Sequence, residues 1–120
     1  MSRGSVLIVE DEAMIAMMIE EYLDVLDFTL FATAGNVEDG LEALAGDSRP
    51  DAALLDCRLG GERSWPIAAR LQELGVPFAF MTGAPDDLFP EAFSRAPRLG
   101  KPFTLASVDE ILSRAMAKAE

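Results

Sequence analysis

The chain contains no histidine and only one cysteine, Cys57, among its 120 residues. The absence of histidine excludes the usual zinc sites and the Ser-His and Cys-His nucleophile pairs, and a single cysteine cannot form an intramolecular disulfide. The sequence also lacks an apolar run of about 18 residues and any signal-peptide pattern. We therefore expect neither a membrane span nor secretion, but a cytoplasmic location.

Basic residues are scarce, with 10 Lys and Arg against 21 Asp and Glu, and the formal net charge is -11. Binding to nucleic acid depends largely on basic side chains that displace counterions, so a nucleic-acid partner is not expected. A protein partner or a cation fits this charge better. The length and the 50% hydrophobic content predict one folded domain over residues 1–120, with no appended output domain.

Short apolar runs alternate with helical patterns along the whole chain, which is typical of βα units around a parallel sheet. The predicted strands are 6–9, 28–33, 52–55, 77–81 and 98–100. Helices are predicted after the first three strands and from Thr104 to the end. The stretch 83–97 contains three prolines and predicts only a short or irregular fourth helix. The pattern thus predicts an α/β fold of the (βα)5 kind.

Polar residues stand where four of these strands end: Glu10-Asp11, Asp56, Thr82 and Lys101-Pro102. In an open α/β sheet the carboxyl ends of the strands line one crevice, so residues far apart in sequence can meet there. Each of them alone has an ordinary structural explanation as a helix start, a turn or a loop residue. Their common position after strands one, three, four and five favours a shared site.

Clustered carboxylates predict a bound cation. Two unit charges about 4 Å apart repel by roughly 4 kcal/mol at an effective dielectric constant of 20. Magnesium suits such a cluster, since it prefers oxygen ligands and leaves positions for phosphate oxygens. Asp56 could then attack phosphorus as a carboxylate nucleophile, with Lys101 neutralising the phosphoryl oxygens and Thr82 donating a hydrogen bond.

With these residues the chain resembles the receiver domain of two-component response regulators. The resemblance covers essentially the whole chain and rests on four motifs: Val-Glu-Asp-Glu at 9–12, Leu-Leu-Asp at 54–56, Met-Thr-Gly at 81–83 and Lys-Pro-Phe at 101–103. The roles that it implies are as follows: Asp56 is the phosphoacceptor, Glu10 and Asp11 are the acidic magnesium pair, the backbone carbonyl of Arg58 is a further magnesium ligand, Thr82 is the switch hydroxyl and Lys101 is the phosphate-binding lysine.

The resemblance also implies a flavodoxin-like, doubly wound sheet of five parallel strands in the order 2-1-3-4-5. It implies that phosphate comes from a phosphohistidine on a sensor histidine kinase or a histidine phosphotransfer protein. Such a chain is a single-domain phosphoacceptor, not a metabolic enzyme. It signals through protein-protein interaction or acts as a phosphate sink.

Two features depart from the common receiver pattern. Many receivers have an aromatic switch residue three positions before the lysine, where this chain has Arg98. The segment 77–83, Pro-Phe-Ala-Phe-Met-Thr-Gly, resembles the fourth-strand motif of the alphaproteobacterial FAT GUY group, although Met81 and Pro85 differ from its usual form. Members of that group are often stand-alone regulators in stress signalling.

Three alternatives remain. A phosphorylation-independent binding module with the receiver fold is one, and failure to bind magnesium would favour it. A haloacid-dehalogenase-type phosphatase is another, but Arg58 stands where that class has an acid two residues after its nucleophile. A dinucleotide-binding domain would need glycines in the first strand-to-helix turn, at 9–13, and none is present.

Overall fold

The structure is a computed structural model that describes residues 2–83 and 89–119, with the backbone alone at 118 and 119. Five parallel strands form one sheet in the order β2-β1-β3-β6-β7. The strands are β1 (Ser5–Val9), β2 (Thr29–Ala34), β3 (Ala52–Asp56), β6 (Phe78–Thr82) and β7 (Arg98–Gly100). Because β6 and β7 are the fourth and fifth predicted strands, the predicted α/β fold and strand order are confirmed.

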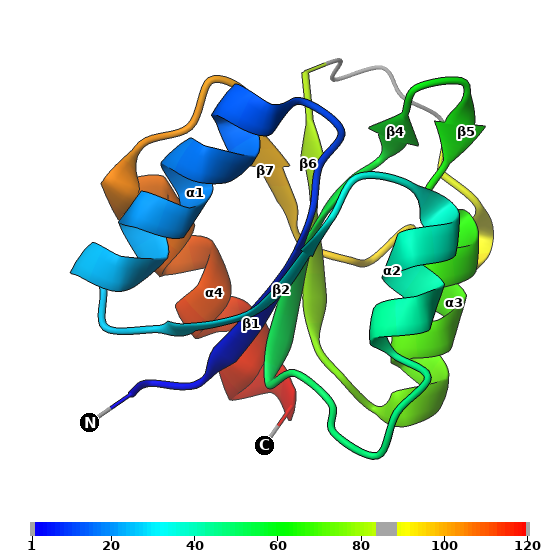
Figure 1. The fold of residues 1–120 in the computed structure, drawn as a ribbon, viewed down its shortest axis with the longest axis horizontal. Helices are drawn as coiled ribbons and strands as arrows, with labels where there is room; N and C mark the ends of the chain where they lie inside the picture. Colours follow the sequence, from blue (N-terminus) through cyan, green and yellow to red (C-terminus); the bar gives the residue numbers. More distant parts are fainter. Residues whose placement is uncertain (1, 84–88, 120) are drawn as a thin grey trace.

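Four α-helices cover the sheet within the described residues: α1 (Ala13–Val25), α2 (Val37–Ala43), α3 (Trp65–Leu74) and α4 (Leu105–Ala119). Helices α1 and α4 lie on one face of the sheet, and α2 and α3 lie on the other (Figure 1). None of the helices in the described part of the chain is both long and apolar enough to cross a bilayer.

The central strands are buried on both faces, which explains their continuous apolar runs. Residues of β1 alternate between two cores: Leu7 and Val9 pack toward α2 and α3, whereas Val6 and Ile8 pack toward α1 and α4. All four of these side chains are fully buried. Packing on both faces therefore fixes the position of each strand in the sheet. The polar residues that follow the strands are fixed at its carboxyl edge as a result.

The helix boundaries follow local sequence signals. Helix α3 has Pro66 in its first turn and ends at Gly75, whose φ of 71° lies in the left-handed region that favours glycine. At the start of α4 the hydroxyl of Thr104 accepts a hydrogen bond from the amide of Ser107 at 3.1 Å. Both signals confirm the predicted ends of these helices.

Two segments differ from a regular βα repeat. Between β6 and β7 the described residues contain only a 3-10 turn, η1 (Glu91–Phe93), as the prolines predicted, while residues 84–88, including Pro85, lie outside the described residues. After β3 the chain forms a two-stranded antiparallel ribbon, β4 (Arg58–Leu59) with β5 (Glu62–Arg63), which the sequence did not predict. This ribbon directly follows Asp56 and lies beside the site.

Candidate functional site

The site lies at the carboxyl edge of the sheet, at the upper ends of the strands in Figure 1. Pairing of neighbouring parallel strands brings the strand ends together: Val9 pairs with Leu55, Asp56 with Met81 and Thr82 with Gly100. Residues from four separated parts of the sequence thereby reach one place. The structure thus brings together the polar strand-end residues that the sequence singled out.

Three carboxylates form the acidic part of the site. Glu10, Asp11 and Asp56 each offer an oxygen atom, and these atoms lie within 4.8 Å of one another. Glu10 and Asp56 are buried, with 2% and 7% of their surface exposed, while Asp11 is exposed. A cluster of this density is costly without compensating positive charge.

Backbone N–H groups supply part of that compensation and hold each carboxylate in place. The amide of Glu12 donates to Glu10 Oε2 at 3.1 Å, and the amide of Arg58 donates to Asp56 Oδ1 at 3.2 Å. The amide of Gly60, in the turn of the β4-β5 ribbon, donates to Asp11 Oδ2 at 2.9 Å. The ribbon therefore orients one of the three acids.

Lys101 supplies the formal positive charge. Its Nζ lies 2.7 Å from Asp56 Oδ2 and 3.2 Å from Glu10 Oε1, and its side chain is only 20% exposed. Burial lowers the pKa of Lys101, but the hydrogen bond and charge of Asp56, together with those of Glu10, outweigh burial and raise it above its ordinary value. The lysine is therefore a fixed cation between two acids.

One lysine stands against three carboxylates, and the buried Glu10 is poorly stabilised as an anion. Burial and the nearby Asp56 raise the pKa of Glu10 from 4.5 to about 7, even though the Glu12 amide and Lys101 favour the ionised form. A second cation beside Glu10 would favour its ionised form. The electrostatics of the site thus fit a bound metal ion.

The donor set also fits a hard divalent cation. Two of the three carboxylates, Asp11 and Asp56, line a cavity of about 400 Å³ whose other lining residues are Glu12, Cys57, Arg58, Gly60, Gly83 and Lys101, and the clustered donors of Glu10, Asp11 and Asp56 are all carboxylate oxygens. Oxygen donors without imidazole or thiolate suit magnesium, calcium or manganese better than zinc or copper. Arg58 lies at the rim of this cavity, and the role of its backbone carbonyl as a ligand stays a prediction.

Thr82 ends β6 and is buried, with 8% of its surface exposed. Its carbonyl accepts a hydrogen bond from the amide of Lys101 at 2.9 Å, so the backbones at the ends of β6 and β7 are tied together. Beyond Lys101, the peptide bond to Pro102 is cis. The role of the Thr82 hydroxyl as a switch stays a prediction.

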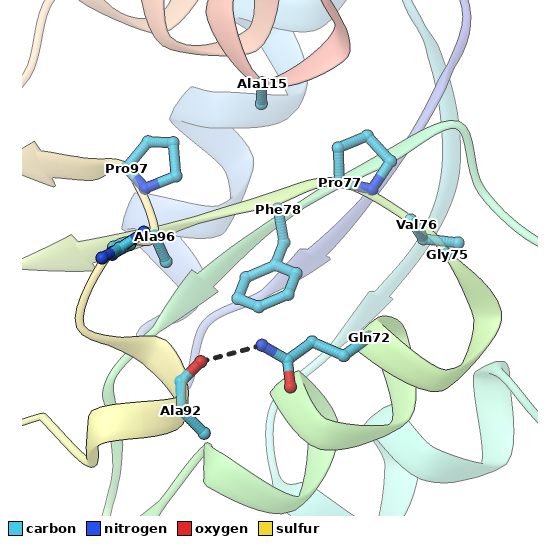
Figure 2. A pocket seen from close by; sticks show the side chains of 10 residues that line it. Gln72, Gly75, Val76, Pro77, Phe78, Ala92, Ala96, Pro97 and Ala115 are labelled. Carbon is cyan, nitrogen blue, oxygen red and sulfur yellow. Dashed lines mark hydrogen bonds between the residues drawn. The ribbon is translucent and has the colours of Figure 1, made fainter. Parts of the chain in front are cut away.

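A second hollow lies at the other end of β6. This pocket measures about 320 Å³. Its walls include Pro77, Phe78, Pro97 and Ala115 (Figure 2). The amide of Gln72 spans part of it by donating to the carbonyl of Ala92 at 3.0 Å. No carboxylate lines this pocket among the described residues, so it lacks the donor set of the strand-end site.

Sequence reasoning missed two parts of the site. The first is the β4-β5 ribbon, which places the Gly60 amide against Asp11. In the sequence only the Gly60-Gly61 pair indicated a turn there, and nothing indicated that the turn would contact Asp11. The guanidinium of Arg98 lies 3.8 Å above the ring of Phe89, and a contact between an edge strand and a loop has no sequence periodicity that could predict it.

The fold and the site define a doubly wound α/β domain with a lysine-bridged acidic site at its carboxyl edge. No family model matches the chain. It is 43% identical to SdrG from Sphingomonas melonis Fr1, over 93% of this chain and 95% of that one, with a TM-score of 0.82. A structure of SdrG in a BeF3-activated conformation superposes with a TM-score of 0.79.

Two PhyR proteins are also similar. The receiver domain of Erythrobacter litoralis PhyR is 28% identical, with coverage of 97% and 92% and a TM-score of 0.83. The phyllosphere-induced regulator PhyR of Methylorubrum extorquens is 30% identical over 119 residues, and the chain spans 43% of its length. The chain belongs to the receiver domains of response regulators, as its motifs indicated.

Proposed function

We propose that this receiver domain accepts a phosphoryl group on Asp56 from a phosphohistidine of a sensor histidine kinase or a histidine phosphotransfer protein. The observation that carries the proposal is the contact of 2.7 Å between Asp56 Oδ2 and Lys101 Nζ inside an acidic cluster. A carboxylate so placed has a cation ready for the oxygens of an incoming phosphoryl group. The existence of a BeF3-activated conformation of SdrG supports the proposal, since BeF3 mimics a phosphoryl group.

In the proposed step a carboxylate oxygen of Asp56 attacks phosphorus. The new P–O bond forms as the P–N bond to the donor imidazole breaks, and the electron pair of that bond returns to the imidazole nitrogen. After transfer, the Lys101 ammonium would contact the phosphoryl oxygens, and the Thr82 hydroxyl would donate a hydrogen bond to one of them. Mg²⁺ held by Glu10, Asp11, Asp56 and the Arg58 carbonyl would neutralise further charge on the phosphoryl group.

We further propose that the domain is a phosphoacceptor and not a turnover phosphatase. Arg58 occupies the position where a phosphatase of the haloacid dehalogenase type has its acid, and its side chain is exposed at the rim of the site. We propose that the phosphorylated domain signals to a downstream protein in the cytoplasm. The resemblance to the FAT GUY group supports a role in a stress response. The acid-rich composition supports a protein, not a nucleic acid, as that partner.

The test is phosphorylation by a small phosphodonor and by a panel of phosphorylated histidine kinases, followed by intact-protein mass. The wild type should gain the mass of one phosphoryl group only when Mg²⁺ is present, and Asp56→Asn should gain none. Asp47→Asn is the matched control, since Asp47 is exposed and outside the site. A wild type that accepts phosphate from no donor, or Asp56→Asn labelled at the wild-type rate, would contradict the proposal.

A further inference from the structure

Arg98 begins β7, three residues before Lys101, and its side chain is held by an aromatic ring. The guanidinium carbon of Arg98 lies 3.8 Å from the centroid of the Phe89 ring. Phe89 is itself fixed by Phe80 and Trp65, with ring centroids 4.9 Å and 5.2 Å away. The rings thus orient a cation that the phosphoryl chemistry does not use.

Stacking on a ring leaves the hydrogen-bonding edge of a guanidinium available. Arg98 has no ion pair and no side-chain hydrogen bond within the described residues, and its contact with Phe89 engages only the π face. By contrast, Arg3 pairs with Asp109 at 2.9 Å, and Arg49 donates to the Leu74 carbonyl at 2.7 Å. Arg98 is therefore an oriented donor without an acceptor in this part of the protein.

A cavity lies beside this donor. It measures about 410 Å³ and is lined by Thr82, Gly83, Arg98, Gly100 and Lys101. No acidic side chain lines it among the described residues, whereas the neighbouring cavity contains Asp11, Glu12 and Asp56. The ammonium of Lys101 is held by Asp56 and Glu10, so Arg98 is the cation available to this cavity, whose described walls contain no anion.

We propose that this cavity is a carboxylate-binding subsite, filled by a single acidic side chain of a protein partner that the Arg98 guanidinium receives bidentately. The planar fork of arginine matches a carboxylate, and a cavity of this size is at the lower end for bound groups. An extended polyanion is disfavoured because the protein as a whole has 21 acidic residues against 10 basic ones and would repel it. One acidic side chain within an otherwise neutral or basic segment fits.

The subsite shares Thr82 and Lys101 with the proposed phosphoryl site, so the two would be linked. That linkage rests on the proposed function, because it requires phosphorylated Asp56. The binding of a carboxylate by Arg98 does not require it. The subsite is therefore tested in the unphosphorylated protein, and its failure would leave the proposed function untouched.

The probe is a blocked tripeptide, acetyl-Ala-Glu-Ala-amide, titrated into the ¹⁵N-labelled protein at constant ionic strength, with the Gln tripeptide as the uncharged analogue. We expect saturable shifts at the amides of Gly83 and Gly100 and at the Arg98 side chain for the Glu tripeptide only. Arg98→Ala should weaken its binding about tenfold, as expected for loss of hydrogen bonds to a charged group. Arg95→Ala, which removes an exposed arginine outside the cavity, should leave the affinity unchanged.

Several results would overturn the subsite. They are shifts that do not saturate, equal shifts with the Gln tripeptide, or unchanged affinity in Arg98→Ala. Tighter binding of inorganic phosphate in a competition titration would overturn the carboxylate assignment. Phe89→Leu retains Arg98 but removes the aromatic ring on which its guanidinium stacks, so it should weaken binding. The amide spectrum of this variant should keep its dispersion away from the cavity, and a loss of dispersion would reveal unfolding instead.

Discussion

At the scale of single residues, Lys101 is the cation on which the metal-free site depends. Its ammonium contacts both Asp56 and Glu10, and its removal would leave two buried acids with backbone N–H donors alone. Loss of one partner of a buried charge pair is costly because the remaining charge is uncompensated. The contacts of Lys101 therefore stabilise the fold as well as prepare the site.

We expect Lys101→Met to lower the free energy of unfolding by about 2 kcal/mol without divalent ions. Saturating Mg²⁺ should recover much of that loss, since it supplies positive charge to the same acids. Urea unfolding with and without Mg²⁺ measures both effects, and Arg114→Met, at an exposed position, is the control. A variant as stable as the wild type without Mg²⁺ would show that Lys101 does not neutralise the cluster.

Glu10 gives the site a predictable pH dependence. Its pKa is raised from 4.5 to about 7 by burial first and by Asp56 in addition. The folded protein therefore binds more protons than the unfolded chain between these pH values. The stability that protonated Glu10 contributes is fully present below pH 4.5 and is lost as the pH rises to about 7. At roughly 1.4 kcal/mol for each pH unit, the loss is at most about 3 kcal/mol.

We therefore expect Glu10→Gln to remove a fall in the free energy of unfolding that the wild type shows between pH ~4.5 and ~7 without metal. Mg²⁺ should reduce that fall in the wild type, because it favours ionised Glu10. Denaturant unfolding across this range, for both proteins, measures the difference. Parallel pH profiles for wild type and Glu10→Gln would mean that the Glu10 carboxyl is not protonated in the fold.

At the scale of elements, the sequence predicted the five strands, because both faces of the central strands are covered and their apolar runs are unbroken. It also predicted the ends of α3 and α4 from Pro66, Gly75 and Thr104. The strand-end acids, Thr82 and Lys101 were predicted as site residues because they come directly after these strands. The β4-β5 ribbon could not be predicted, since two-residue strands have no periodicity and the partner of Gly60 lies 49 residues away in sequence.

The turn of that ribbon makes a further prediction. Gly60 has a φ of 63°, in the left-handed region, and an added Cβ would meet no atom within 4 Å. Gly60→Ala should therefore cost about 1 kcal/mol through backbone conformation alone. Because the Gly60 amide holds Asp11, Mg²⁺ affinity should fall as well.

Gly61→Ala is the matched control for this turn. An added Cβ there also meets nothing within 4 Å, and Gly61 is not among the residues with positive φ. Thermal unfolding and Mg²⁺ titration of the two variants separate the backbone effect from general disturbance of the ribbon. Equal Mg²⁺ affinity in Gly60→Ala and Gly61→Ala would mean that the Gly60 amide does not orient Asp11.

At the scale of the whole molecule, the net charge of -11 means that any salt should stabilise the fold to some degree. Screening of this kind rises gradually and does not depend on one residue. Binding at a site saturates, and it stabilises the folded state by mass action. The two effects of Mg²⁺ can therefore be separated by matching ionic strength and by changing one acid.

At matched ionic strength, we expect Mg²⁺ to raise the melting temperature of the wild type in a saturable way and that of Asp11→Asn much less. Asp11 is exposed and receives one hydrogen bond, from Gly60, so its replacement should leave the fold intact while removing a charged oxygen from the cluster. Asp47→Asn makes the same change of net charge away from the site and should respond like the wild type. If Asp11→Asn and Asp47→Asn respond alike, the effect of Mg²⁺ is screening of the whole molecule, and the three carboxylates hold no metal ion.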